Sequence, residues 1–226
     1  MTSPVVVLGA GGFGREVLDV IDAVNLASVR DGAAPLWGLL GVVDDAPSDI
    51  NLGRLQARSV RHLGSLDDVL LTVGAGVHYV VGIGSPAVRR RLATACDAAR
   101  LVAATLIHPD ATVGSMTVVG AGTVVCAGVR ISTNVSLGRH VHLNANATVG
   151  HDSVIGDHVS LNPLAAVSGD CVIGDGVLVG VAGVVLNGLR VGRDAVIGGS
   201  ACVVTHVEPG ATVIGVPARQ LAAREA

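Results

Sequence analysis

The sequence predicts an α/β domain with parallel strands, followed by a β-helix built from hexapeptide repeats. The first observation is an aliphatic residue at every sixth position from Ile107 to Val203, without a break. The second is a glycine-rich turn at residues 9–14, directly after an apolar run. The third is that all Phe, Tyr and Trp residues precede residue 80. We therefore expect two domains, residues 1–104 and 105–226.

The first domain alternates between strand and helix patterns. An apolar run at residues 5–8 is typical of a buried parallel strand, and a helix with one apolar face follows it. Further strands are expected at residues 39–43, around 60–63 and at 79–83, before a helix that contains three arginines at 89–91. This alternation predicts a Rossmann-like fold.

The glycine turn fits the pattern GxGxxG, in which backbone amides and a helix N-terminus favour a phosphate group. A complete dinucleotide fold is not expected. The acidic pair Asp44-Asp45 comes about thirty residues after Gly14, rather than about twenty, and the repeats begin before a second half would fit. The turn therefore predicts a site for one nucleotide diphosphate. The alternative is that the glycines serve only strand–helix packing.

The repeats predict the architecture of the second domain. Each six-residue unit supplies a short strand and a turn, three units close a triangular coil, and stacked coils pair as parallel strands. The aliphatic residue fills the interior, and a small residue four positions later lets the chain turn. The repeated aliphatic residues are Ile107, Val113, Val119, Val125, Ile131, Leu137, Leu143, Val149, Ile155, Leu161, Val167, Ile173, Val179, Val185, Val191, Ile197 and Val203.

Composition excludes several classes of function. The chain has no Lys, so a lysine Schiff base or lysine general base is excluded. The net charge of −3 argues against nucleic acid as a partner. No apolar run has transmembrane length and no basic signal segment opens the chain, which predicts a cytoplasmic protein without membrane contact. The four Cys form no CxxC pair and are expected to be reduced packing residues.

Several segments together resemble one family. They are GAGGFGRE at 9–16, LGVVDD at 40–45, VVGIGSPAVRRRL at 80–92 and IHPDATVG at 107–114. The chain resembles the NeuD/PglD-type sialic-acid O-acetyltransferases and UDP-amino-sugar N-acetyltransferases over nearly its whole length. The resemblance implies left-handed coils, homotrimers with each active site between adjacent prisms, and acetyl-CoA as co-substrate.

The resemblance also assigns residues of the acyl-transfer site. The segment LNANATVGHDSVIGD matches the family's active-site stretch, which identifies His151 and Asp152 as catalytic residues and Asn144 as a substrate-binding residue. The amide of Gly169 is expected to face the thioester carbonyl. Near the C-terminus, VIGVPAR matches a motif close to coenzyme A. Coenzyme A is expected to contact Gly199, Ala201 and Pro217.

In the first domain, the resemblance implies that the glycine turn faces the phosphates and that acidic residues face the base. By position these are Gly11, Gly12, Asp44 and Asp45. The chain also departs from many members, which carry His and Lys in the glycine turn and a second His near the thioester. Here these positions are Phe13, Arg15 and Ser160.

These residues predict a mechanism. Imidazole titrates near neutrality, so His151 can take the proton of an attacking amine and pass it to the departing thiolate. Asp152 would fix its tautomer, and the Gly169 amide would stabilise the oxyanion. No Ser or Cys forms an evident pair with the His, which favours direct transfer. The predicted function is acetyl-CoA-dependent acylation of the amino group of a nucleotide-linked amino sugar.

Three alternatives remain. One is O-acetylation of sialic acid or another sugar hydroxyl. Another is a zinc site like that of β-helical carbonic anhydrases, because His140 and His158 lie one coil apart; a ladder of two His without metal is favoured, and no metal is expected. The third is a non-catalytic sugar-nucleotide-binding scaffold. Asn144 and Asn162 are also one coil apart, which is equally consistent with a structural hydrogen-bond ladder.

Overall fold

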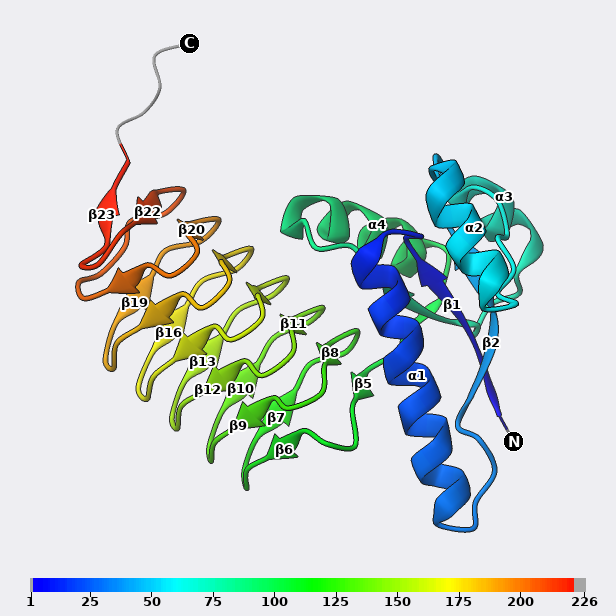
Figure 1. The fold of residues 1–226 in the computed structure, drawn as a ribbon, viewed down its shortest axis with the longest axis horizontal. Coiled ribbons are helices and arrows are strands. Elements are labelled where there is room, and N and C mark those ends of the chain that lie inside the picture. Colours follow the sequence, from blue (N-terminus) through cyan, green and yellow to red (C-terminus); the bar gives the residue numbers. More distant parts are fainter. Residues whose placement is uncertain (1, 222–226) are drawn as a thin grey trace. The chain divides into compact units, whose positions relative to one another are not determined.

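The computed structural model describes residues 2–221. The chain divides into two compact units, Met1–Pro109 and Asp110–Ala226, which we describe separately (Figure 1). The binding and transfer roles expected of residues 1–104 and 105–226 remain predictions. Within residues 2–221, no helix combines the length and the apolar character that a bilayer span requires.

The first unit contains a four-stranded parallel sheet in the order β2-β1-β3-β4. The central strand β1 is fully buried at Val5, Val6 and Val7, as expected of a parallel strand covered on both faces. This arrangement confirms the predicted Rossmann-like fold. The elements are β1 (Ser3–Leu8), α1 (Gly12–Arg30), β2 (Trp37–Val43), α2 (Asp49–Ala57), α3 (Leu66–Thr72), β3 (His78–Val81), α4 (Pro86–Ala98), β4 (Val102–Ala103) and β5 (Leu106–Ile107).

The strand predicted around residues 60–63 does not form. This segment makes one parallel bridge to β2, in which the Val42 amide donates to Arg61 O and the Leu63 amide donates to Val42 O, both at 2.8 Å. One more hydrogen bond follows, from the Asp44 amide to Gly64 O at 3.1 Å. The ladder does not continue because Gly64 turns the chain with a φ of +95° and Ser65 begins the capping box of α3. The β-like composition was a local signal, and the nearby helix start overrides it.

The glycine turn contains two kinds of glycine. A Cβ at Gly14 would overlap the carbonyl oxygen of Gly9, and a Cβ at Gly82 would lie 2.5 Å from Gly14 Cα. These glycines let α1 pack directly against the strand ends. In contrast, a Cβ at Gly11 or Gly12 would meet nothing within 4 Å. The packing alternative therefore accounts for Gly14 but not for Gly11 and Gly12, where the backbone is open.

The second unit is a three-faced solenoid of short strands, all but β22 with two residues (Figure 1). Each strand pairs in parallel with strands eighteen residues away, as in Ser136↔Val154. The first face contains β6 (Thr112–Val113), β9 (Arg130–Ile131), β12 (Thr148–Val149), β15 (Ala166–Val167), β18 (Val184–Val185) and β21 (Cys202–Val203). The second face contains β7 (Val118–Val119), β10 (Ser136–Leu137), β13 (Val154–Ile155), β16 (Val172–Ile173) and β19 (Arg190–Val191).

The third face completes each coil and carries the C-terminal end of the described chain. It contains β8 (Val124–Val125), β11 (His142–Leu143), β14 (Ser160–Leu161), β17 (Leu178–Val179), β20 (Val196–Ile197) and β22 (Thr212–Ile214), to which β23 (Arg219–Gln220) pairs antiparallel. We name the corners by their residues. The His151 corner joins the first and second faces, the His140 corner joins the second and third, and the Asn144 corner joins the third and first.

The solenoid interior is built as the repeats predict. From Val125 onward the repeated aliphatic side chains are buried, Val149 and Ile155 for example, and so are small residues before the next strand, such as Ala147 and Ala165. Val113, at the open end of the solenoid, is 41% exposed. Most turns also use a left-handed residue, such as Asp152 with a φ of 59°. Asn and Asp tolerate this conformation better than most residues, which explains why they are frequent in these turns.

We predict that Gly14→Ala destabilises the first unit by roughly 1–3 kcal/mol, because the added methyl group overlaps the Gly9 carbonyl. Trp37, the single Trp of the chain, lies on β2 and reports on this unit in urea unfolding followed by fluorescence. The matched control is Gly12→Ala, which should stay within about 0.5 kcal/mol of the unchanged protein. Equal stability of the two variants would contradict the packing role.

Candidate active site

His151 lies in the turn between β12 and β13, at the His151 corner. Its Nδ1 lies 2.6 Å from Asp152 Oδ2. The side chains of His151 and Asp152 are 56% and 44% exposed, so an incoming molecule can reach them. A carboxylate at Nδ1 favours the tautomer with the proton on that nitrogen, which leaves the Nε2 lone pair available as a proton acceptor.

The Asp152 carboxylate is held from a second side. Asn134 Nδ2 donates to Asp152 Oδ1 at 2.7 Å, so each carboxylate oxygen has its own partner. The Asn134 amide, and secondly the hydrogen bond to His151, hold the pKa of the Asp152 carboxyl below its ordinary value. Asp152 is therefore a carboxylate at neutral pH, the form that can orient an imidazole.

Gly169 lies one coil above His151 in the stack. A Cβ at Gly169 would lie 2.6 Å from both Cε1 and Nε2 of the His151 ring, so only glycine lets the ring take this place. Within residues 2–221, the Gly169 N–H makes no hydrogen bond, whereas the equivalent amides of Arg139 and Asp157 donate to carboxylates in the next coil. The corner thus combines a proton acceptor with an unused N–H donor.

Two polar residues of this corner were missed by the sequence reasoning. Asn134 supports Asp152 from the coil below. Asp170, from the coil above, brings a carboxylate oxygen within 4.8 Å of the ligand atoms of His151 and Asp152. The signal was available, because residues 134, 152 and 170 are separated by one eighteen-residue coil each.

Other predicted residues of the second unit lie elsewhere. Asn144 and Gly199 occupy turns of the Asn144 corner, as does Pro217 in the loop between β22 and β23. This corner is at the opposite edge of the first face from His151. Asn144 Nδ2 donates to Asn162 Oδ1 at 3.1 Å, which is the ladder expected of these two amides. Within one chain, these residues do not join the His151 corner.

Ala201 lies in the interior of the solenoid and not at its surface. Its side chain is fully buried in the solenoid, its amide donates to Gly198 O at 3.1 Å, and its carbonyl accepts from the Val184 amide at 2.8 Å. A role for Ala201 toward coenzyme A is therefore restricted to shaping the turn beside Gly199. Ser160, where many relatives of the family carry a second His, is buried on the third face.

The geometry of Cys171 and of the stacked histidines is unfavourable for the alternative chemistries. The Cys171 thiol is buried, burial raises its pKa, and Sγ donates to Leu186 O at 3.2 Å, so it is a packed thiol and not a nucleophile. The rings of His140 and His158 are parallel within 1°, with centroids 5.3 Å apart. A metal binds in the plane of an imidazole, so two rings stacked face to face do not direct their nitrogens at one ion.

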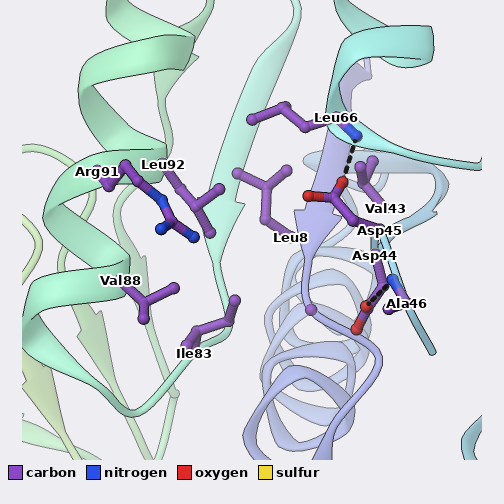
Figure 2. Close-up of a pocket in the computed structure, with 11 residues that line it drawn as sticks. Leu8, Val43, Asp44, Asp45, Ala46, Leu66, Ile83, Val88, Arg91 and Leu92 are labelled. Carbon is purple, nitrogen blue, oxygen red and sulfur yellow. Dashed lines mark hydrogen bonds between the residues drawn. The ribbon is translucent and has the colours of Figure 1, made fainter. Parts of the chain in front are cut away.

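The first unit has a cavity of about 190 Å³ at the carboxyl ends of its strands (Figure 2). Asp44 and Asp45, at the end of β2, both line it. Figure 2 shows Arg91 pointing from α4 into this cavity; the sequence reasoning did not select it, although it lies in the basic run after β3. Gly11 and Gly12 are not among the lining residues.

The carboxylates of Asp44 and Asp45 accept hydrogen bonds from backbone amides of the first unit. Asp44 Oδ2 accepts from the Ala10 amide at 2.8 Å, and Asp44 Oδ1 accepts from the Ala46 amide at 3.1 Å. Asp44 therefore ties β2 to the glycine turn. Asp45 Oδ1 accepts from the Leu66 amide at 2.8 Å, and no hydrogen bond of the described chain occupies its Oδ2. Asp45 is thus the better candidate for contacting a ligand.

Comparisons with known proteins agree with this architecture. Residues 4–96 match the family model of the PglD N-terminal domain. No curated protein sequence matches the chain. The acetyltransferase domain of PglB from Neisseria gonorrhoeae FA1090 is 26% identical, with a TM-score of 0.80 over 97% of this chain and 100% of that chain.

Two further solved structures extend the likeness. A mutant of perosamine N-acetyltransferase from Caulobacter crescentus, in complex with CoA and GDP-perosamine, is 26% identical, with a TM-score of 0.84 over 99% of each chain. WeeI from Acinetobacter baumannii AYE is 23% identical, with a TM-score of 0.81 over 97% of this chain and 100% of that chain; this likeness concerns the fold.

The fold and the His151 corner, together with these likenesses, define the class as acyltransferases with a left-handed β-helix behind a Rossmann-like domain. Residues 4–96 are similar to the PglD N-terminal domain. Over its full length the chain resembles the NeuD/PglD-type sugar acetyltransferases, which confirms the resemblance that its motifs predicted.

We predict that Gly169→Ala lowers the rate of acyl transfer by about 10²-fold, because the new methyl group displaces the His151 ring by the order of an ångström. NMR of the His151 ring protons should show the displacement directly. Circular dichroism should show an intact solenoid. Unchanged ring resonances with unchanged turnover would contradict the contact between His151 and Gly169.

Proposed function

We propose that this protein transfers the acetyl group of acetyl-CoA to the amino group of a nucleotide-linked amino sugar, with His151 as general base. The observation that carries the proposal is the His151–Asp152 pair seated on Gly169, beside an N–H that the protein leaves unused. Relatives of the same fold support it, since one is a perosamine N-acetyltransferase with CoA and GDP-perosamine and another is an acetyltransferase domain with acetyl coenzyme A.

The mechanism is direct transfer within a ternary complex. His151 Nε2 accepts a proton from the amine as the amine nitrogen attacks the thioester carbonyl carbon. The Gly169 N–H donates to the oxyanion of the tetrahedral intermediate. Collapse of the intermediate breaks the carbon–sulfur bond, and the imidazolium returns its proton to the leaving thiolate. Asp152 stabilises the imidazolium in between. Within residues 2–221 the His151 ring is paired with Asp152 and with no Ser, Thr or Cys side chain, which favours direct transfer over a covalent route.

The proposal includes a homotrimer in which a neighbouring prism completes each site. Gly199, Pro217 and Asn144 lie at the Asn144 corner, at the far edge of the first face from His151. A coenzyme A molecule between two prisms would contact the His151 corner of one chain and the Asn144 corner of the next. A site between chains thus brings the predicted residues of the second unit together around one bound coenzyme A.

For the first unit we propose binding of the sugar nucleotide. The cavity beside Asp45 and Arg91 offers a carboxylate oxygen for the N–H groups of a base and a guanidinium for acceptors. The open backbone at Gly11 and Gly12, at the start of α1, suits a diphosphate. The resemblance favours a uridine nucleotide and the Caulobacter relative was solved with a guanosine nucleotide, so both bases belong in the substrate screen.

We predict that His151→Ala lowers the chemical rate by roughly 10²–10⁴ while acetyl-CoA still binds, because the base is lost and most of the cofactor contacts are remote. Asp152→Asn should cost less, since it removes orientation and not the proton acceptor. Rapid-quench kinetics with nucleotide amino sugars, and with sialic acids as hydroxyl acceptors, measures both. Near-normal turnover of His151→Ala, with chemistry rate-limiting, means that the amine arrives deprotonated and the proposed base is wrong.

We predict that calorimetry detects binding of a nucleotide sugar and no tight binding of NAD. Asp45→Ala should weaken nucleotide-sugar binding by about tenfold, as loss of a hydrogen bond to a charged group implies. Asp44→Ala should weaken it as well, because Asp44 holds the glycine turn. The control Asp67→Asn, on the exposed first turn of α3, should bind normally. Tight NAD binding without a nucleotide-sugar response would reverse this assignment.

A further inference from the structure

Residues 134, 152 and 170 form a column at the His151 corner. They take the same place in three successive coils, and all three are left-handed, with φ values of 56°, 59° and 57°. The Asp152 amide donates to Thr133 O at 3.2 Å and the Asp170 amide donates to His151 O at 2.8 Å, which keeps the three turns in register. Their side chains therefore project from the corner one above another.

A chain of hydrogen bonds runs along this column to the imidazole. Asn134 Nδ2 donates to Asp152 Oδ1 at 2.7 Å, and Asp152 Oδ2 lies 2.6 Å from His151 Nδ1. A carboxylate held at only one oxygen can rotate about its last bond. With an amide on Oδ1, Oδ2 stays directed at the imidazole.

Asn134 has a side-chain N–H donor, which Asp152 and Asp170 in the same column lack. Asp170, above Asp152, brings a carboxylate oxygen into the same 4.8 Å group, and a carboxylate side chain has no N–H to donate. The side chain of Asn134 donates to Asp152 Oδ1 at 2.7 Å. The residues above and below Asp152 are therefore not equivalent partners for its carboxylate.

We propose that Asn134 is a positioning residue for the acyl-transfer base: its side-chain amide fixes the Asp152 carboxylate, and through it the orientation and tautomer of His151. The inference rests on the proposed function, in which His151 is that base. It assigns to Asn134 no contact with substrate. Asn134 acts only through Asp152, and this dependence is what the experiment measures.

The test is a double-mutant cycle with Asn134→Gly and Asp152→Asn. Gly suits a φ of 56°, so Asn134→Gly removes the amide without straining the turn. In the full-length protein, Asn134→Gly should lower kcat by about tenfold, the size typical of partners that orient a functional side chain, with KM for both substrates unchanged. In the Asp152→Asn background it should lower kcat by less than about twofold, because the residue through which it acts is already changed.

Asp157→Ala is the matched control. It removes another contact between successive coils, from the Arg139 amide to Asp157 Oδ1, at the His140 corner. We expect its kcat to be unchanged. A loss of kcat in Asp157→Ala equal to that in Asn134→Gly would overturn the proposal, since any weakened coil contact would then have the same effect.

The variant Asn134→Asp provides a second measurement, the pH dependence of kcat/KM. A purely structural role of Asn134 would leave this pH dependence unchanged. The groups that titrate beside His151 are Asp152 in its own turn and Asp170 in the turn above, while the turn below contributes the neutral Asn134. A carboxylate at position 134 adds negative charge and favours the protonated imidazole. The rising limb of the kcat/KM–pH profile should therefore shift to higher pH. An unmoved limb in a folded variant would overturn the proposal.

The outcomes separate the two hypotheses. If His151→Ala keeps normal turnover, the proposed function fails and the proposal falls with it. If His151→Ala is inactive and the effects of Asn134→Gly and Asp152→Asn simply multiply, the function stands and the inference about Asn134 is overturned. Because Asn134→Asp has nearly the size of the native residue, it tests the proposal even if Asn134→Gly folds poorly.

Discussion

The eighteen-residue coil is the constraint on which the second unit depends. Parallel pairing between coils places every residue beside those eighteen positions before and after it, as in Thr148↔Ala166. Each interior position must therefore hold a side chain that stacks on one of similar size in the next coil. This explains why the interior contains aliphatic and small residues and why Phe, Tyr and Trp are absent from the repeats. The same constraint acts outside the prism, where it builds columns of turn residues. The candidate active site is one such column together with its neighbour, His151 beneath Gly169.

The site also contains a backbone N–H donor that has no hydrogen-bond partner in the ladder between coils. In each turn the residues that flank the corner donate into the ladder, as Gly150 does to Val167 O and Asp152 to Thr133 O. The amide between them has no ladder partner. At the His140 corner the solenoid satisfies such amides with the carboxylates of Asp157 and Asp175. At the His151 corner the amide of Gly169 is left unused beside the imidazole. A preorganised N–H of this kind costs no reorganisation when negative charge develops.

The sequence predicted the features that repeat and missed those that depend on a single contact. The period of six identified the solenoid, and motif spacing selected His151, Asp152 and Gly169, which the structure brings together. The prediction of a strand at 60–63 was wrong because strand composition is local. The segment bridges the edge strand β2, but α3 begins before a second bridge can form. Asn134 carries no recognisable motif. Its contact follows only when the coil period is applied to polar turn residues as well as to the aliphatic ones.

The charged side chains at the His151 corner explain how this column of turn residues can assist acyl transfer. Direct transfer requires an imidazole that is neutral before attack and cationic while the tetrahedral intermediate exists. The Asp152 carboxylate beside Nδ1 stabilises the cation while the intermediate exists. The Asn134 amide, and secondly the hydrogen bond to His151, lower the pKa of the Asp152 carboxyl, so this group stays ionised. The column thus keeps a charged carboxylate directed at the imidazole throughout the transfer.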